Sequence, residues 1–384
     1  MPQKKETYEV KLEGKAKPRA LLIFMDGTWN DENGRGNDGA VTNIYKMFST
    51  LSGSHRGGDI PHQKRTAKHL GLYFRGVGND EENIRSIGFY QGAFGAGERN
   101  IRDHAYASLC RHYRPGDQIC ILGYSRGAAS ARLLAAKLHE HGLPKRIDLY
   151  YRQLKNRVNG ESEWMFSHYQ AEEENSMPIE VSFLGLFDTV GAFGIPIDLG
   201  PLNFQRINLF RDLTVAANVK QAVHLVAIDE SREPFIPTLT NFRESIDEVW
   251  FPGNHGDVGG GYHESNLGNI ALDYMVTRLQ ETVKDPEINF SKHIARFLDY
   301  DLRRDDFHIH YHEDGFKKEP RRMHVLHDQQ PSDLPVKIHK AALSLQEQDH
   351  FYFAERFNSF TTRTPIRYNP INLRALGENY KVVK

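Results

Sequence analysis

Cysteine and long hydrophobic runs are both scarce in this chain of 384 residues. It holds two cysteines, Cys110 and Cys120, so a disulfide framework is excluded and synthesis in a reducing compartment is the simplest interpretation. No apolar run approaches the ~18 residues that a transmembrane helix needs. The first residues also lack the apolar segment of a signal peptide. We therefore expect a cytoplasmic protein, or one exported without a classical signal peptide.

An excess of charge of either sign is also missing. The 49 Lys and Arg residues nearly balance the 50 Asp and Glu residues, which gives a net charge of −1. We therefore expect no nucleic acid among the partners, because whole-chain binding to nucleic acid needs a positive excess. Hydrophobic residues make up 39% of the chain, a globular value that allows a large core. These features exclude a channel, a collagen and a coiled coil.

Composition divides the chain into three regions. We interpret residues 1–18 as a polar arm, 19–284 as the core and 285–384 as a C-terminal extension packed on that core. The arm is expected to be a solvated tail, with a transient contact to a membrane surface as the alternative. Within the core, the polar residues 145–178 form either a lid or a structured surface insertion.

Strands alternate with helices along the core. Apolar strands are predicted at 19–25, 70–74, 118–123, 181–187, 223–228 and 248–251. Helices are predicted at 43–51, 98–113, 128–138 and around 272–283. This alternation predicts an α/β fold with a doubly wound, mostly parallel sheet. Polar residues that follow its strands should meet at one edge of the sheet, namely Asp26, Ser125, Asp188, Asp229 and His255.

The segment Gly123-Tyr124-Ser125-Arg126-Gly127 fits the pattern Gly-x-Ser-x-Gly. In this pattern the serine occupies a strained turn between a strand and a helix, which lifts its hydroxyl above the sheet. Gly123 and Gly127 would let the strand and the helix pass close to the turn. We therefore interpret Ser125 as a nucleophile; the alternative is a serine that only caps the helix.

An acyl-transfer reaction also needs donors for the oxyanion that develops on the substrate. The backbone N–H of Arg126 begins the helix after the serine and is the first candidate. The second should come from the loop Asp26-Gly27-Thr28, where Gly27 or Thr28 is the candidate and Asp26 supports the loop. A simple Asp-Gly turn is the alternative.

A serine nucleophile needs a histidine base. His255 is the candidate, because it lies in the glycine-rich segment that follows the strand at 248–251. Three other histidines are kept in reserve: His224, His263 and His339.

The base in turn needs a carboxylate that orients it. Asp188 follows an apolar strand and lies between Ser125 and His255 in the chain, which is the usual order in this kind of fold. Asp229 and Asp257 are its rivals, although Asp257 is better explained as a support of its own loop.

Two other classes of function are open at this point. A metal-dependent esterase could use Asp26, His255 and Asp257, and a binding protein could retain the fold without catalysis. Three histidines also alternate in the segment FHIHYH, at positions 308, 310 and 312, where they face one side of a predicted strand. A solvated strand face explains them better than a metal site, so we expect no metal and no cofactor.

Five segments together resemble a known family. FMDGTWN, GAFGAG, ILGYSRGAASAR, GLFDTVG and WFPGNHGDVGGGY occur here in this order. They are similar to a widespread family of bacterial and fungal α/β hydrolases that includes phospholipase effectors of the type VI secretion system. The resemblance covers roughly residues 19–280 and implies hydrolysis of lipid or small esters by Ser125, Asp188 and His255. It also leaves an immunity protein among the candidate partners.

Overall fold

The computed structural model describes most of the chain. Its described residues are 3–14, 16–34, 39–56, 61–77, 90–155, 162–172, 176–191, 214–302, 307–312, 317–347, 351–357, 360–365 and 367–384. Within them, no helix is long and apolar enough to cross a membrane.

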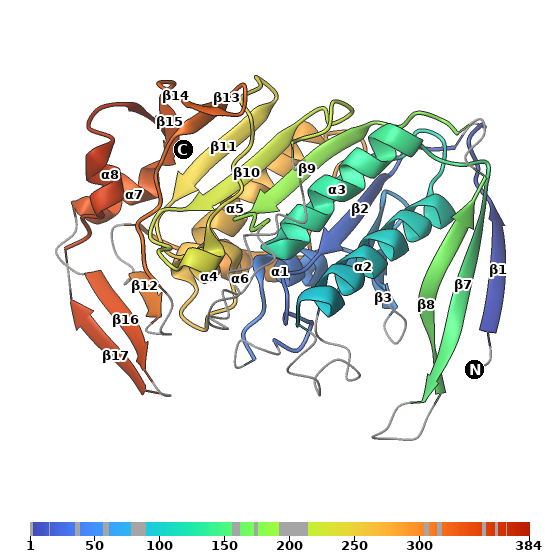
Figure 1. Ribbon diagram of the computed structural model, residues 1–384, viewed down its shortest axis with the longest axis horizontal. Coiled ribbons are helices and arrows are strands. Elements are labelled where there is room, and N and C mark those ends of the chain that lie inside the picture. The colour runs from blue at the N-terminus through green and yellow to red at the C-terminus, as the bar shows by residue number, and fades with distance from the viewer. Residues whose placement is uncertain are drawn as a thin grey trace, which may run out of the picture.

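A mostly parallel sheet forms the centre of the molecule (Figure 1). In the described residues it has ten strands, in the spatial order β18 (Tyr380–Val383), β15 (Val336–His339), β11 (Ile246–Phe251), β10 (Ala222–Ala227), β9 (Val181–Phe187), β6 (Gln118–Tyr124), β2 (Ala20–Met25), β5 (His69–Phe74), β4 (His62–Arg65) and β3 (Ser54–Arg56). Strands β18 to β5 run parallel, whereas β4 pairs antiparallel with β5 and β3 pairs antiparallel with β4. The predicted fold class is therefore confirmed.

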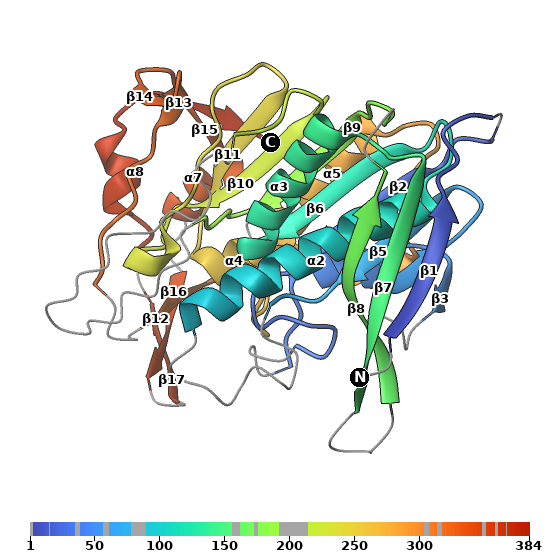
Figure 2. The ribbon, with the colours of Figure 1, turned by 45° about the vertical axis from the view of Figure 1, so that its right-hand side comes forward.

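Both faces of the sheet are covered, which explains why its central strands are continuous apolar runs. In β2, Leu22 and Phe24 belong to one hydrophobic cluster, whereas Leu21 and Ile23 belong to the other. Helices α1 (Asn43–Thr50) and α5 (Asn266–Thr282) supply the first cluster, and α2 (Tyr90–His112) and α3 (Arg126–His141) supply the second. Figure 2 shows α2 and α3 lying across the same face.

The N-terminal arm is a strand and not a solvated tail. Strand β1 (Gln3–Glu9) joins β7 (Arg146–Lys155) and β8 (Ser162–Ala171) in a separate antiparallel sheet at one end of the molecule (Figure 1). Lys5 and Thr7 both contact Asp148, at 2.9 and 2.6 Å. The sequence around residue 5 could not predict this strand, because its partner lies about 140 residues away. Within the stretch 145–178, the strands β7 and β8 pack against α2.

The C-terminal region belongs to the same sheet as the core. Strands β15 and β18 extend the main sheet beyond β11, so no structural boundary falls at residue 284. The strand expected at 307–312 is present as β12 (Phe307–His312). The other short elements are η2 (Glu233–Phe235), α4 (His255–Gly259), η3 (Lys292–Ile294), α6 (Ala295–Leu298), β13 (Val325–His327), β14 (Gln330–Ser332), α7 (Lys340–Gln346), β16 (Phe351–Phe357), β17 (Phe360–Pro365) and α8 (Ile371–Ala375).

Candidate active site

Ser125 occupies the sharp turn between β6 and α3. Its backbone has a φ of 57° and a ψ of −123°, a strained conformation for any residue except glycine. Its side chain makes no capping hydrogen bond to the helix, so the interpretation of Ser125 as a mere helix cap is wrong. The backbone N–H of Ser125 donates to the Phe187 carbonyl at 2.9 Å. This bond places the turn beside the end of β9.

Gly123 and Gly127 lie where backbone segments pass too close to one another for any side chain to fit. A Cβ atom on Gly123 would lie 2.4 Å from the Gly127 carbonyl oxygen, and one on Gly127 would lie 2.3 Å from the Met25 carbonyl oxygen. Neither contact is possible without moving the main chain. The two glycines therefore let α3 start directly against β6 and β2, as the sequence pattern predicts.

Asp188 and His255 meet beside this turn. Asp188 follows β9, has a positive φ of 40° and is fully buried. His255 begins α4, and its Nδ1 atom lies 2.6 Å from Asp188 Oδ2. A neutral imidazole held in this way donates its Nδ1 proton to the carboxylate, which leaves Nε2 as the basic nitrogen. The pair thus has the tautomer that a general base requires.

Aromatic rings hold the imidazole in place. The ring of Tyr124, next to the serine, stacks on the His255 imidazole with ring centroids 4.7 Å apart. The Phe235 ring is tilted against the same imidazole, with centroids 4.9 Å apart. A Cβ atom on Gly259 would come within 2.0 Å of the Tyr124 ring. Gly259, in the same helical turn as His255, therefore makes room for the ring that links the serine turn to the histidine.

Arg321 is a site residue that the sequence did not reveal. Its guanidinium donates to both carboxylate oxygens of Asp188, at 2.7 and 2.9 Å, and also to the carbonyls of Ala227 and Phe235. The residue is 7% exposed and comes from the C-terminal region. Its position next to Arg322 in an irregular segment gave no sequence signal for this role. The C-terminal region therefore contributes directly to the site.

Charge and burial act in opposite directions on the Asp188–His255 pair. Burial would raise the pKa of Asp188, but the charge of Arg321 and the hydrogen bonds from His255 and Arg321 hold it well below its usual range. Burial lowers the pKa of His255 below 6.5, although its hydrogen bond with Asp188 works against this. At neutral pH the pair is consequently an ionised carboxylate and a neutral imidazole.

Glu230 is a second residue that sequence analysis missed. Its carboxylate accepts a hydrogen bond from the His255 backbone N–H at 3.3 Å and pairs with Arg232 at 2.7 Å. Burial opposes ionisation of Glu230, but the hydrogen bond and charge of Arg232 lower its pKa to about 2. A fixed negative charge thus lies at the start of α4, close to the histidine.

The loop predicted to complete the oxyanion hole lies against the start of α3. Thr28, Arg126 and Gly127 line the same small cavity of about 10 Å³. The Gly27 N–H, however, donates to Asp26 Oδ1 at 2.8 Å, so the prediction of Gly27 as an oxyanion donor is wrong. Thr28 is the remaining candidate of the two, and its buried hydroxyl makes no hydrogen bond within the described residues.

Asp26 supports this loop, as expected. Its carboxylate accepts hydrogen bonds from the Tyr73 hydroxyl at 2.7 Å, from the Thr42 hydroxyl at 2.9 Å and from Gly27. Burial raises the pKa of Asp26 to about 7 despite these bonds. The side chain is thus fully occupied in tying the loop to α1 and β5.

Asp257 supports the histidine loop. It accepts from the Asn254 N–H, which closes a capping box at α4, and it contacts His310 Nδ1 at 2.6 Å. Asp26, Asp257 and His255 therefore each have different partners. Among the residues that the structure describes, no group of three metal-ligating side chains occurs.

The remaining candidates have structural contacts. His224 contacts Glu248 at 2.9 Å and accepts from the Thr189 N–H, while His339 caps α7 and stacks on Phe251. Asp229 accepts from the Gly253 N–H and from the Tyr368 hydroxyl. None of these three side chains forms the Asp–His pair at the serine turn.

A parallel sheet with a strained serine turn after a central strand, and an Asp–His pair at the same edge, defines an α/β hydrolase. The chain belongs to the Tle1-like family of type VI secretion system phospholipase effectors, whose catalytic-domain model matches residues 19–278. This confirms the resemblance of the five sequence segments. The family is one of lipase-like and phospholipase-like carboxylic ester hydrolases.

Individual relatives are more distant. An uncharacterized protein of Saccharomyces cerevisiae (strain ATCC 204508 / S288c), YEL023C, is 31% identical over 150 residues, which is 34% of this chain and 20% of the yeast protein. A crystal structure of an uncharacterized protein from Pseudomonas aeruginosa is 21% identical, with a TM-score of 0.43, 75% of this chain covered and 49% of that chain. The Tle1 effector bound to the VgrG spike is 20% identical, with a TM-score of 0.39, 69% of this chain covered and 58% of that one. The chain thus spans less than two thirds of each of these relatives.

Proposed function

We propose that the protein is a serine hydrolase that cleaves acyl esters of lipids through an acyl-enzyme. The observation that carries this proposal is the buried Asp188–His255 pair, joined by the Tyr124 ring to the strained turn of Ser125. A neutral histidine oriented by a carboxylate is what a serine hydroxyl needs in order to act as a nucleophile at neutral pH.

In this mechanism Ser125 Oγ attacks the ester carbonyl carbon while His255 Nε2 accepts the hydroxyl proton. The N–H groups of Arg126 and Thr28 stabilise the oxyanion. His255 then gives the proton to the leaving alcohol, and an acyl-serine ester remains. Water, deprotonated by His255, attacks this ester, and the carboxylic acid is released as the Ser125 hydroxyl forms again.

Phospholipids are the substrate class that we propose within this reaction. The family whose catalytic-domain model matches two thirds of the chain is described as one of phospholipase effectors. Delivery by a type VI secretion apparatus, with an immunity protein in the producing cell, belongs to the same proposal.

A substrate panel tests the proposed function. Phosphatidylcholine and phosphatidylglycerol vesicles, a triglyceride emulsion and p-nitrophenyl butyrate would be compared, with fatty-acid release or p-nitrophenol as the readout. We expect release of fatty acid from the phospholipid vesicles, and no release by a Ser125→Ala variant. Activity confined to the short soluble ester would contradict the phospholipid assignment while leaving the serine mechanism in place.

The pH dependence of kcat/KM should follow the protonation of His255. The imidazole must be neutral to accept a proton, and burial lowers its pKa below 6.5. We therefore expect the acid limb of kcat/KM, where His255 gains a proton, to be centred below pH 6.5. Initial rates with p-nitrophenyl butyrate between pH 4.5 and 8 measure this. An acid limb centred above pH 7 would contradict the assignment.

A further inference from the structure

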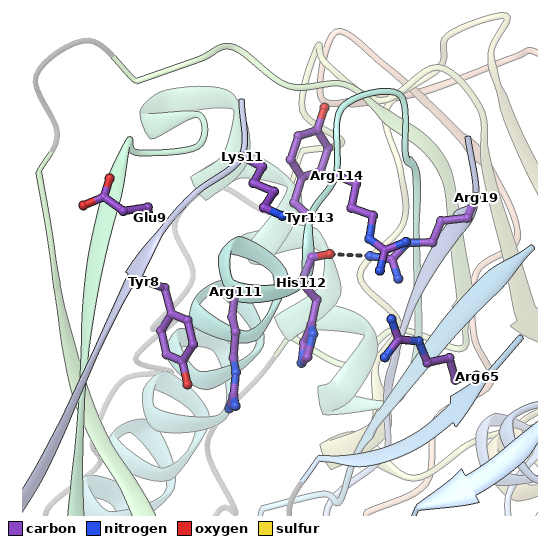
Figure 3. Close-up of a pocket in the computed structure, with 9 residues that line it drawn as sticks. All are labelled: Tyr8, Glu9, Lys11, Arg19, Arg65, Arg111, His112, Tyr113 and Arg114. Atoms are coloured by element: carbon purple, nitrogen blue, oxygen red, sulfur yellow. Dashed lines mark hydrogen bonds between the residues drawn. The ribbon is translucent and has the colours of Figure 1, made fainter. Parts of the chain in front are cut away.

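A second pocket lies at the opposite edge of the sheet from Ser125. Its volume is about 270 Å³, and Figure 3 shows the side chains that line it: Tyr8, Glu9, Lys11, Arg19, Arg65, Arg111, His112, Tyr113 and Arg114. Arg19 directly precedes β2, whereas the candidate active site follows the carboxyl end of that strand. The six residues of β2 span about 20 Å, so the pocket is separate from the hydrolase site.

The pocket concentrates positive charge in a chain that is otherwise balanced. Five cationic side chains line it, against the single carboxylate of Glu9, which points away from the others in Figure 3. Lys11, Arg65 and Arg114 are exposed, and their side chains form no ion pair or hydrogen bond with any residue that the structure describes. These three cations therefore face the cavity without an ion pair of their own. The carboxylate of Asp117 is already paired with Arg19, although its charge also acts on Arg114.

Two of the arginines are held by the protein itself. Arg19 is 2% exposed, pairs with Asp117 at 3.1 Å and donates to the His112 carbonyl. Arg111 lies over the Tyr8 ring at 4.7 Å, with Glu6 at 3.9 Å. Arg19 and Arg111 therefore line one side of the pocket in fixed positions, next to the three cations that form no ion pair. Strand β1 lines the pocket as well, through Tyr8 and Glu9.

The pKa of the His112 imidazole is lowered in this pocket. Burial lowers its pKa to about 4, and the positive charges of four arginines act in the same direction. These are Arg111, Arg19, Arg65 and Arg114. His112 is therefore neutral at pH 7 and can form a hydrogen bond in the pocket without adding charge.

We propose that this pocket binds a phosphate group. Guanidinium groups bind phosphate oxygens through paired hydrogen bonds, and Arg65 and Arg114 approach the cavity from two different segments. The volume fits a small phosphorylated group and lies below the usual size of a pocket for a larger organic ligand. The phosphate could belong to a soluble molecule or to the headgroup of an anionic lipid. This proposal does not depend on the proposed hydrolase function, because the two sites share no residue.

Calorimetric titration of the full chain with inorganic phosphate tests the proposal. We expect saturable binding, at least tenfold weaker in the double variant Arg65→Gln/Arg114→Gln. The matched control is Arg152→Gln/Arg374→Gln, which removes two exposed arginines outside the pocket and should bind phosphate as the wild type does. Both variants should retain the thermal unfolding temperature and the rate on p-nitrophenyl butyrate, which shows that fold and hydrolase site are intact.

Vesicle flotation distinguishes the two sources of phosphate. Vesicles of phosphatidylcholine with 20% phosphatidic acid, a composition chosen as roughly one anionic lipid in five, would be compared with phosphatidylcholine alone. Association with the anionic vesicles that is lost in Arg65→Gln/Arg114→Gln supports a lipid headgroup. Phosphate binding without such association supports a soluble ligand. The absence of phosphate binding, or equal weakening by the pocket and control variants, would overturn the proposal.

Discussion

Replacing Ser125 with alanine should lower kcat for ester hydrolysis by roughly 10⁴ to 10⁶-fold, because no other group in the mechanism can form the acyl-enzyme. The fold should be unaffected, since the Ser125 side chain makes no capping hydrogen bond. Steady-state rates on p-nitrophenyl butyrate, together with thermal unfolding, measure both expectations.

Ser130 offers the matched control for this change. It is also a buried serine at the start of α3, and its hydroxyl donates to Glu98 Oε1 at 3.1 Å, away from the Asp188–His255 pair. A Ser130→Ala variant should therefore keep most of its activity. A Ser125→Ala variant that hydrolyses esters at the wild-type rate would rule out the serine mechanism.

Replacing Arg321 with methionine should have the next largest effect. It leaves the buried Asp188 carboxylate without its only charged partner among the described residues and without two hydrogen bonds, so we expect a loss of about 3 kcal/mol in the free energy of unfolding. With the guanidinium charge gone, the pKa of His255 should rise, and the acid limb of kcat/KM should move to higher pH. We expect kcat/KM at pH 7 to fall roughly 10 to 100-fold, as for loss of a group that orients a catalytic residue.

Two further variants separate positioning from stability in this result. Arg322→Met removes the exposed neighbouring arginine and should change neither the pH profile nor the stability. Arg321→Lys retains a positive charge and should restore part of the wild-type acid limb. If Arg321→Met lowered stability but left the pH profile in place, Arg321 would be a structural residue only.

The parts of the site that could be predicted from the sequence are those that local patterns encode. An apolar strand followed by Gly-x-Ser-x-Gly needs close backbone packing at two glycines, and the structure has that packing at Gly123 and Gly127. Asp188 could be selected because it directly follows an apolar strand, and His255 because it lies in the glycine-rich loop after another strand of the parallel sheet. The order of strands and helices predicted the fold class for the same reason.

The parts that escaped prediction depend on contacts between distant segments. Arg321 and Asp188 are 133 residues apart, and nothing near Arg321 marks it as a partner of a buried carboxylate. Strand β1 forms only because residues near 148 supply its pairing partner. The Gly27 N–H, predicted as an oxyanion donor, instead donates to the Asp26 side chain. A sequence motif cannot show this hydrogen bond, because it depends on the rotamer of Asp26.

Mass mapping of a fluorophosphonate adduct is the most direct test of the central claim that Ser125 is an activated nucleophile. We expect a single covalent adduct on the peptide that contains Ser125, absent from the Ser125→Ala variant and formed far more slowly in His255→Gln. An adduct on another residue, or labelling that persists in Ser125→Ala, would contradict it.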